Sequence, residues 1–152
     1  MTRCIIPGSF DPVTVGHYDI IKTMSERFDE VFAVVFANSE KTYMFDDDKR
    51  LSMLECACRN FDNVKTDISS ELVVDYAKSR DIHTIVKGVR SNFDFEYEQR
   101  IAMINRELCP DIETLLYPAC PENIFISSSF VREMIKYGKD VSSYIPKYVK
   151  IK

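Results

Sequence analysis

Hydroxyl, imidazole and cationic side chains follow the predicted strands of this chain at several points. Ser9 and His17 come after the first predicted strand, Lys41 after the second, and Lys87 and Arg90 after the fourth. The carboxyl ends of parallel strands meet at one edge of a sheet, so these side chains are expected to lie close together. Lysine as a point charge, arginine as a planar fork and a hydroxyl donor all suit phosphate. The spacing therefore predicts a site for phosphorylated ligands at that edge.

Two predicted helix starts add backbone donors to this set. One helix begins at Gly16 and carries His17 on its first turn, and another, over Phe130 to Tyr137, follows Ser127 to Ser129. Free N–H groups and the positive end of a helix dipole bind anions. Taken singly, the Gly8 to Pro12 segment could be a simple turn and the serines could be helix caps. The combination is far more specific than any of its parts.

The elements that must position these groups alternate along the chain. Apolar runs predict strands at residues 3–6, 31–37, 64–67, 84–86 and 114–117. Between them, helical periodicity predicts helices after Gly16, after the Asp46 to Asp48 cap, over 71–78, through a long segment containing Tyr97 to Leu108, and over 130–137. Pro7 and Gly8 are expected to form a turn, and Lys87 to Arg90 a loop. Alternating strands and helices indicate an α/β fold with a five-stranded parallel sheet flanked by helices, in a single domain over residues 1–152.

The composition narrows the class of protein. The 152 residues carry a net charge of −4, which argues against a nucleic-acid binder that neutralises many phosphates. Apolar stretches are short and interrupted, so neither disorder nor a membrane span is expected. Pro7, Gly8 and Asp11 interrupt the first residues, which leaves no apolar run for a signal peptide. We therefore expect a cytoplasmic protein.

Cysteines, histidines and glycines exclude several kinds of site. The five cysteines form no CxxC pair, which argues against a disulfide framework or a structural zinc site. With only His17 and His83, a metal site built from several histidines is excluded, and no metal ligand is assigned. The four glycines are too far apart for a GxGxxG fingerprint or a Walker A loop. A nucleotide would have to bind by another route.

Three ordered motifs give this chain a family resemblance. They are GSFDPVTVGH from Gly8 to His17, KGVRSNFDFEYE from Lys87 to Glu98, and ISSS from Ile126 to Ser129. The first and last resemble the signatures of the nucleotidyltransferase superfamily. Thr14, the DFEYE segment and the chain length make it similar to the bacterial phosphopantetheine adenylyltransferases. The resemblance implies a Rossmann-like nucleotidylyl transferase fold.

That resemblance implies a reaction. The family transfers the adenylyl group of ATP to 4′-phosphopantetheine, giving dephospho-coenzyme A and pyrophosphate, in the penultimate step of coenzyme A synthesis. The attacking phosphate has a second pKa of about 6, so it needs no general base and no covalent enzyme intermediate. Mg²⁺ is expected with ATP, held mainly by phosphate oxygens and water, with Asp11 and Asp94 as outer groups. The resemblance also implies a homohexamer and feedback by coenzyme A.

By resemblance, the ATP site draws on all three motifs, and the catalytic residues are His17, Lys41 and Arg90. His17 would donate a hydrogen bond to the α-phosphate, Arg90 would hold the ATP phosphates, and Ser9 would bridge ATP and the incoming phosphate. The last serines would hold the β- and γ-phosphates through their hydroxyls and the helix start. The implied ATP-binding residues are Ser9, Phe10, His17, Gly88, Val89, Arg90, Glu98, Asn123, Ile124, Phe125, Ile126, Ser127, Ser128 and Ser129.

The acceptor site is implied in the same way. Lys41 would bind the phosphate of phosphopantetheine. Ser9 stands where the family has threonine and Lys87 where many members have arginine, so a hydroxyl and a charge are kept while the bidentate fork is lost. The uncharged pantetheine arm calls for an apolar groove with a few amide partners. The implied substrate-binding residues are Ser9, Lys41, Leu72, Val73, Lys87, Tyr97 and Asn105.

Three alternatives stay open from the sequence. The nearest is a nucleotidyltransferase with another phosphorylated acceptor, against which Thr14 and the DFEYE segment argue. Another is a nucleotide sensor without turnover, which has no evident need for His17, Lys41 and Arg90 together. The third is a fragment of a class I aminoacyl-tRNA synthetase. This chain lacks the lysine-rich loop of those enzymes, and its net negative charge suits tRNA binding poorly.

Overall fold

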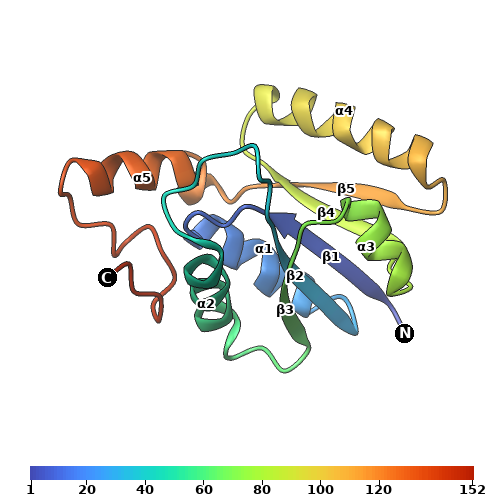
Figure 1. The fold of residues 1–152 in the computed structure, drawn as a ribbon, viewed down its shortest axis with the longest axis horizontal. Coiled ribbons are helices and arrows are strands. Elements are labelled where there is room, and N and C mark those ends of the chain that lie inside the picture. The colour runs from blue at the N-terminus through green and yellow to red at the C-terminus, as the bar shows by residue number, and fades with distance from the viewer.

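Five parallel strands form one sheet in the order β3-β2-β1-β4-β5 (Figure 1). The computed structural model describes residues 1–152. The strands are β1 (Arg3–Gly8), β2 (Glu30–Phe36), β3 (Val64–Ser69), β4 (Thr84–Val89) and β5 (Glu113–Pro118). The helices are α1 (Val15–Ser25), α2 (Asp47–Cys58), α3 (Val73–Ser79), α4 (Asn92–Leu108) and α5 (Ser128–Lys136), with a short 3-10 helix, η1 (Pro121–Asn123), before α5. The predicted fold class is confirmed.

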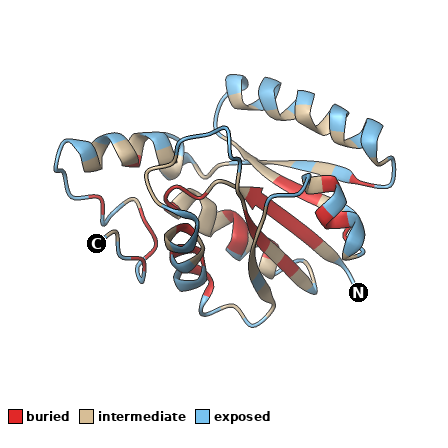
Figure 2. Ribbon diagram, viewed as in Figure 1, coloured by how far each residue is buried: buried red, intermediate tan, exposed pale blue.

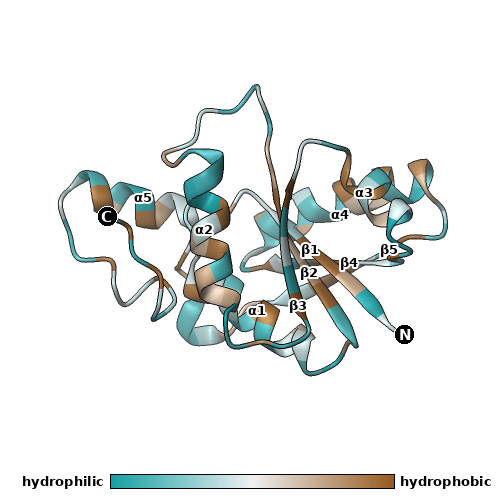
Figure 3. Ribbon diagram, turned by 60° about the horizontal axis from the view of Figure 1, so that its bottom comes forward, coloured by the Kyte–Doolittle hydropathy of each residue, from teal (hydrophilic) through white to brown (hydrophobic).

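The two faces of the sheet are covered unequally. Side chains alternate along each strand, so Cys4 and Ile6 join one core cluster and Ile5 between them joins the other. The larger cluster holds 20 buried residues and packs α1, α2, α5 and the C-terminal segment against the sheet. The smaller holds eight and is built with α3. Hydrophobic residues dominate β1 and β2, which are largely brown in Figure 3, as expected of central strands covered on both faces.

A cleft opens where the strand order reverses. β2 and β3 lie on one side of β1, and β4 and β5 on the other, so the switch point is between β1 and β4. These two strands pair only at Cys4 with Thr84 and Ile5 with Ile85, although both continue for several residues. Beyond that pairing their carboxyl ends separate. Ligands of open α/β sheets bind at this kind of opening.

Two predicted loop segments belong to strands instead. Pro7 and Gly8 continue β1 and pair with Val34 and Val35 of β2, so the expected turn there is wrong. Residues 87–89 continue β4 and pair with residues 116–118 of β5, so the expected loop begins only at Arg90. Glycine, proline and charge suggested a break at both places, but the backbone pairing with the neighbouring strand outweighs local preference.

The apolar face predicted for α4 is not buried within the chain. No residue of α4 is buried, and Tyr97, Ile104 and Leu108 are 54%, 49% and 58% exposed. Figure 2 accordingly shows α4 in pale blue and tan, in contrast to the red of β1. The helical spacing was therefore predicted correctly, but this face is not covered by other parts of the chain.

Candidate active site

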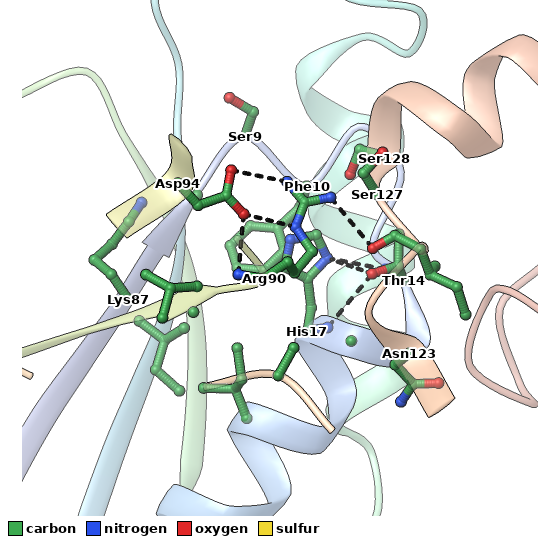
Figure 4. Close-up of a pocket in the computed structure, with 18 of the residues that line it drawn as sticks. Ser9, Phe10, Thr14, His17, Lys87, Arg90, Asp94, Asn123, Ser127 and Ser128 are labelled. Atoms are coloured by element: carbon green, nitrogen blue, oxygen red, sulfur yellow. Dashed lines mark hydrogen bonds and ion pairs between the residues drawn. The ribbon is translucent and has the colours of Figure 1, made fainter. Parts of the chain in front are cut away.

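The separated ends of β1 and β4 line a cavity of about 380 Å³, a size suited to a small-molecule ligand. Its floor comes from the ends of both strands, and its rim from the starts of α1, α4 and α5 (Figure 4). Many predicted ATP-site residues lie on its wall: Ser9, Phe10, His17, Gly88, Val89, Arg90, Glu98, Asn123, Ile126, Ser127, Ser128 and Ser129, together with Lys87 from the acceptor set.

His17 is held by the start of its own helix. Thr14 is the N-cap of α1, and its hydroxyl accepts from the His17 backbone N–H. In return, the Thr14 backbone N–H donates to His17 Nδ1 over 3.0 Å, so the imidazole takes the place that glutamate has in a capping box. A backbone N–H can only donate, so Nδ1 is the unprotonated nitrogen. Nε2 therefore carries the proton of the neutral ring, and it has no partner within the chain.

The surroundings of His17 favour its neutral form. Burial, followed by the positive charges of Lys87 and Arg90, lowers the pKa of His17 from 6.5 to about 4. The ring of Phe10 packs edge-on against the imidazole with 4.9 Å between ring centroids. His17 is thus a positioned hydrogen-bond donor and not a cation near neutral pH.

Two cations in the cavity are paired with carboxylates of α4. Arg90 Nε donates to Asp94 Oδ2 over 2.9 Å, and its Nη1 approaches the carbonyl of Ile126. Lys87 Nζ lies 3.5 Å from Glu98 Oε1. Both cations remain partly exposed to the cavity, where a polyanion can compete for them. Glu98 is therefore a partner of Lys87, a role that the sequence did not suggest.

At the start of α5, backbone N–H groups are free to bind an anion, whereas the serine hydroxyls already have partners. Ser127 is the N-cap and accepts from Phe130 N, and Ser128 donates its hydroxyl to the carbonyl of Pro12 over 2.8 Å. These two hydroxyls already have partners within the chain. The backbone N–H groups of Ser128 and Ser129 have none and line the cavity. An anion at this helix start would meet these N–H groups first.

Arg132 lines the cavity although the sequence did not suggest it, and Asp11, expected as an outer group of Mg²⁺, supports the same wall. Arg132 lines the cavity one turn after Ser129 and donates to Ser129 Oγ and to the backbone carbonyl of Asp11. The buried Asp11 carboxylate accepts from Met44 N and Phe45 N, each over 2.9 Å. The i, i+3 spacing of Ser129 and Arg132 could have identified the arginine. Nothing local in the sequence indicates the bonds of Asp11.

Several predicted residues lie outside the cavity wall. Lys41 is exposed on the loop between β2 and α2. Asn123 is not among them: it lines the wall, but its side-chain amide donates to Asp19. Asn105 follows Glu98 by two helical turns, so it continues the cavity-facing side of α4. The others outside the wall are Leu72, Val73, Tyr97, Ile124 and Phe125, all exposed or half-buried.

The carboxylates near the cavity do not form a metal cage. No group of three or more histidine, cysteine, aspartate or glutamate side chains is placed to hold an ion. Asp94 is engaged by Arg90, and Asp11 by backbone N–H groups and by Arg132 at 3.8 Å. A divalent cation here would need most of its ligands from phosphate oxygens and water. None of the helices combines the length and hydropathy that a bilayer crossing requires.

Comparison with known proteins agrees with this geometry. The profile of the family described as cytidylyltransferase-like matches residues 5–134. The phosphopantetheine adenylyltransferase of Alkaliphilus metalliredigens is 41% identical over 145 residues, covering 95% of this chain and 92% of that protein.

Two solved structures share the fold at low sequence identity. A Vibrio parahaemolyticus protein assigned as a nicotinate-nucleotide adenylyltransferase aligns with a TM-score of 0.69 and 20% identity, over 95% of this chain and 94% of that one. Nicotinic acid mononucleotide adenylyltransferase of Plasmodium falciparum, in complex with NaAD, gives 0.66 and 19%, over 95% and 90%. With the profile and the 41% identical relative, the chain belongs to the cytidylyltransferase-like family and is a nucleotidyltransferase.

Proposed function

We propose that this enzyme transfers the adenylyl group of ATP to 4′-phosphopantetheine, giving dephospho-coenzyme A and pyrophosphate. The observation that carries the proposal is the neutral His17, whose free Nε2–H faces a cavity with two cations and two unpaired helix N–H groups. The choice of acceptor is supported by the 41% identical phosphopantetheine adenylyltransferase. The reaction is the penultimate step of coenzyme A synthesis, and we place it in the cytoplasm.

The chemistry is a single in-line displacement. An oxygen of the acceptor phosphate forms a bond to the α-phosphorus of ATP, and the bond from that phosphorus to the α,β-bridging oxygen breaks. Pyrophosphate carries away the electron pair of that bond. The acceptor phosphate is already ionised near neutral pH, so no residue has to remove a proton. The enzyme has to hold two anions in line and stabilise the charge that develops between them.

Each cavity group suits one part of that task. His17 Nε2–H donates to an oxygen of the α-phosphate and keeps its proton throughout. Lys87 and Arg90 exchange their carboxylate partners for phosphate oxygens, Arg90 toward ATP and Lys87 toward the acceptor. The N–H groups of Ser128 and Ser129 receive the departing pyrophosphate. These interactions strengthen as charge grows, which is the condition for catalysis.

The acceptor is held by a second set of residues. Lys41 contacts the phosphate of phosphopantetheine from its exposed loop, and its long, rotatable side chain lets the point charge move toward the anion. The pantetheine arm follows the side of α4 that continues from Glu98 to Asn105. Tyr97, Leu72 and Val73 are assigned to the acceptor by the family resemblance. Mg²⁺ enters with ATP and neutralises phosphate charge. We also propose that the enzyme is a homohexamer and that coenzyme A, which contains the product, competes for this site.

Pyrophosphate release from ATP and Mg²⁺ tests the proposal. 4′-Phosphopantetheine, glycerol 3-phosphate and nicotinamide mononucleotide serve as parallel acceptors, and removal of Mg²⁺ by EDTA serves as a blank. We expect release with phosphopantetheine alone. Release with another acceptor alone would reassign the substrate, and no release by folded protein that binds ATP would favour a nucleotide sensor.

His17→Ala tests the role of the imidazole in the same assay. We expect kcat to fall by about 10²–10³-fold, as for loss of one oxyanion donor, with the Kd for ATP changed by less than about threefold. Isothermal titration with ATP supplies that Kd. A loss of ATP affinity as large as the loss of rate would assign His17 to ground-state binding instead.

Lys41→Ala tests the acceptor side. The KM for phosphopantetheine should rise by roughly tenfold or more while the KM for ATP stays close to that of the wild type, because a charge pair to the acceptor alone is lost. An unchanged acceptor KM would remove Lys41 from the site.

A further inference from the structure

Arg50 is a completely buried cation just behind the cavity. It lies on the first turns of α2 with 0% of its surface exposed, and no other lysine or arginine of the chain is buried. It does not line the cavity itself. A buried charge costs free energy unless it is well paired, so an arginine at such a place calls for an explanation from its contacts.

Those contacts join two separate loops. Arg50 Nη1 donates to the backbone carbonyl of Ser9 over 2.9 Å, and Nη2 donates to Asp47 one turn earlier on α2. The guanidinium carbon lies 3.7 Å from the ring centroid of Tyr43, a stacked cation–π contact. Nε has no hydrogen-bond partner. The only hydrogen bond or cation–π contact that Arg50 makes beyond its own helix is thus with Ser9 or with Tyr43 of the loop between β2 and α2.

The bond to Ser9 fixes the direction of the next backbone N–H. The Ser9–Phe10 peptide is trans, so its carbonyl and its N–H point in opposite directions. The carbonyl points to Arg50, so the Phe10 N–H points the opposite way, away from Arg50. Ser9 and Phe10 both line the cavity, whereas Arg50 does not. This N–H has no partner within the chain.

Phe10 holds a backbone conformation that needs support. Its φ is +48°, in the left-handed region that a bulky residue rarely adopts. Such conformations persist where the surroundings over-determine them, and they concentrate at functional sites. Here the buried Phe10 ring, packed against His17, holds one side, and the Arg50 bond to the preceding carbonyl holds the other.

The stack on Tyr43 links Arg50 to the loop that carries Lys41. The Tyr43 hydroxyl accepts from Asn38 N over 3.1 Å. This hydrogen bond joins the two ends of the segment that contains Lys41. Asp11 fixes the two following residues through their backbone N–H groups. The same guanidinium thus contacts both the loop after β1 and the loop after β2.

We propose that Arg50 is a positioning residue of the nucleotidyl-transfer site: it directs the Phe10 N–H into the cavity as a phosphate donor and, through Tyr43, sets the Lys41 loop relative to that donor. This inference rests on the function proposed above and on the family resemblance, which implies that Ser9 bridges ATP and the acceptor phosphate. The charge of Arg50 acts through the Ser9–Phe10 peptide and not by contact with substrate.

Arg50→Lys tests the proposal because it keeps the charge and loses the planar fork and the stack. We expect kcat per folded protein to fall by about 10–100-fold, the scale of a small misplacement in an active site. Arg59→Lys is the matched control, since Arg59 ends the same helix and stacks on Tyr148 at 4.1 Å, away from the cavity. It should keep kcat within about twofold. An Arg50→Lys enzyme with kcat within twofold of the wild type would overturn the proposal.

A second measurement does not depend on the acceptor. Labelling with [15N]phenylalanine gives ten amide signals, and Phe10→Leu identifies that of Phe10. Addition of ATP to the wild type should shift the Phe10 signal, and the shift should shrink in Arg50→Lys. The proposal would be overturned if ATP did not shift the Phe10 signal of the wild type, or shifted it equally in Arg50→Lys. A missing phosphopantetheine reaction with an intact ATP response would instead overturn only the proposed acceptor.

Tyr43 variants test the same proposal without changing Arg50, in case the Arg50 variants do not fold. Tyr43→Leu removes the stacked ring and should raise the KM for phosphopantetheine by roughly fivefold or more, through the displaced Lys41 loop. Tyr43→Phe keeps the ring and loses only the hydroxyl that accepts from Asn38 N. It should therefore lie between the wild type and Tyr43→Leu. An unchanged acceptor KM in Tyr43→Leu would refute the link to Lys41.

Discussion

At the scale of single residues, the site depends on which nitrogen of His17 is protonated. His17 donates through Nε2 only because the Thr14 backbone N–H occupies Nδ1. The cations beside it keep the ring neutral, and the same cations attract phosphate. One arrangement therefore both binds the polyanion and preserves a neutral donor for it.

The two histidines of the chain should titrate on opposite sides of the ordinary value of 6.5. The pKa of His17 is lowered to about 4, whereas a hydrogen bond to Asp81, followed by the Asp111 carbonyl, raises the pKa of the exposed His83. NMR of the imidazole signals against pH measures both, and His83→Gln assigns them. Added ATP should raise the pKa of His17, because its phosphates oppose Lys87 and Arg90.

The sign of the effect on stability follows from the same shift. Between pH 6.5 and about 4 the unfolded chain binds a proton at His17 that the folded chain does not. The contribution of His17 to the free energy of unfolding is therefore full above pH 6.5 and falls as the pH drops toward 4. A His17 signal that titrates near 6.5 in the free enzyme would contradict both statements.

Residue types and order predicted much of the cavity wall, but they could not predict its supports. His17, Lys87, Arg90 and the serines stand in motifs or directly after strands, so their sequence context locates them. Arg50 looks like an ordinary surface residue of α2, next to acidic neighbours. Its role depends on Ser9, 41 residues away along the chain. Contacts of that kind depend on tertiary packing, which local spacing does not encode.

At the scale of elements, the cavity exists because β1 and β4 separate after two paired positions. Gly88 lies on the separated part of β4 and lets α1 approach it closely. A Cβ at this position would collide with Cδ1 of Ile20, a buried residue of α1 one turn after His17. The resemblance placed Gly88 among the ATP-binding residues, and the structure adds a packing reason for glycine at this position.

Gly88→Ala should therefore destabilise the protein by roughly 1–3 kcal/mol, the usual cost of overpacking. Removing the obstructing Cδ1 with Ile20→Val should recover most of that loss in the double variant, although Ile20→Val alone costs about 0.5–1.5 kcal/mol. Urea unfolding of the four proteins gives the coupling energy. Additive losses would show that strain elsewhere in β4, and not contact with Ile20, requires glycine.

Element boundaries show where local sequence reasoning is weakest. All five strands and the five α-helices were predicted in the right order, because apolar periodicity is a strong signal over several residues. The ends of β1 and β4 were placed too early, since Pro7, Gly8 and Lys87 are poor strand residues taken alone. Both ends lie beside paired neighbours, which the sequence does not reveal. These misplaced ends are the segments that form the floor of the cavity.

At the scale of the whole molecule, the two faces of the sheet are covered to different extents. The face with α1, α2 and α5 holds the larger core, whereas α4 covers its part of the other face without burying a residue of its own. The large apolar side chains exposed along α4 and on the neighbouring β5 are Phe93, Phe95, Tyr97, Met103, Ile104, Leu108 and Leu115. Of these, Phe93, Tyr97, Ile104 and Leu108 recur at helical spacing on one face of α4, and an apolar face left exposed marks an interaction site in soluble proteins. The hexamer proposed above would cover this face with a second copy of the chain.

Ile104→Glu should therefore lower the molecular mass in solution. Ile104 is 49% exposed in the single chain, so a charge costs little in a monomer but must be desolvated where subunits meet. Light scattering after size exclusion should give six chains for the wild type and fewer for the variant. Tyr137→Glu is the matched control, since Tyr137 is 69% exposed beyond the end of α5. An unchanged mass for Ile104→Glu, or a wild type that is monomeric at micromolar concentration, would show that α4 does not contact another copy of this chain.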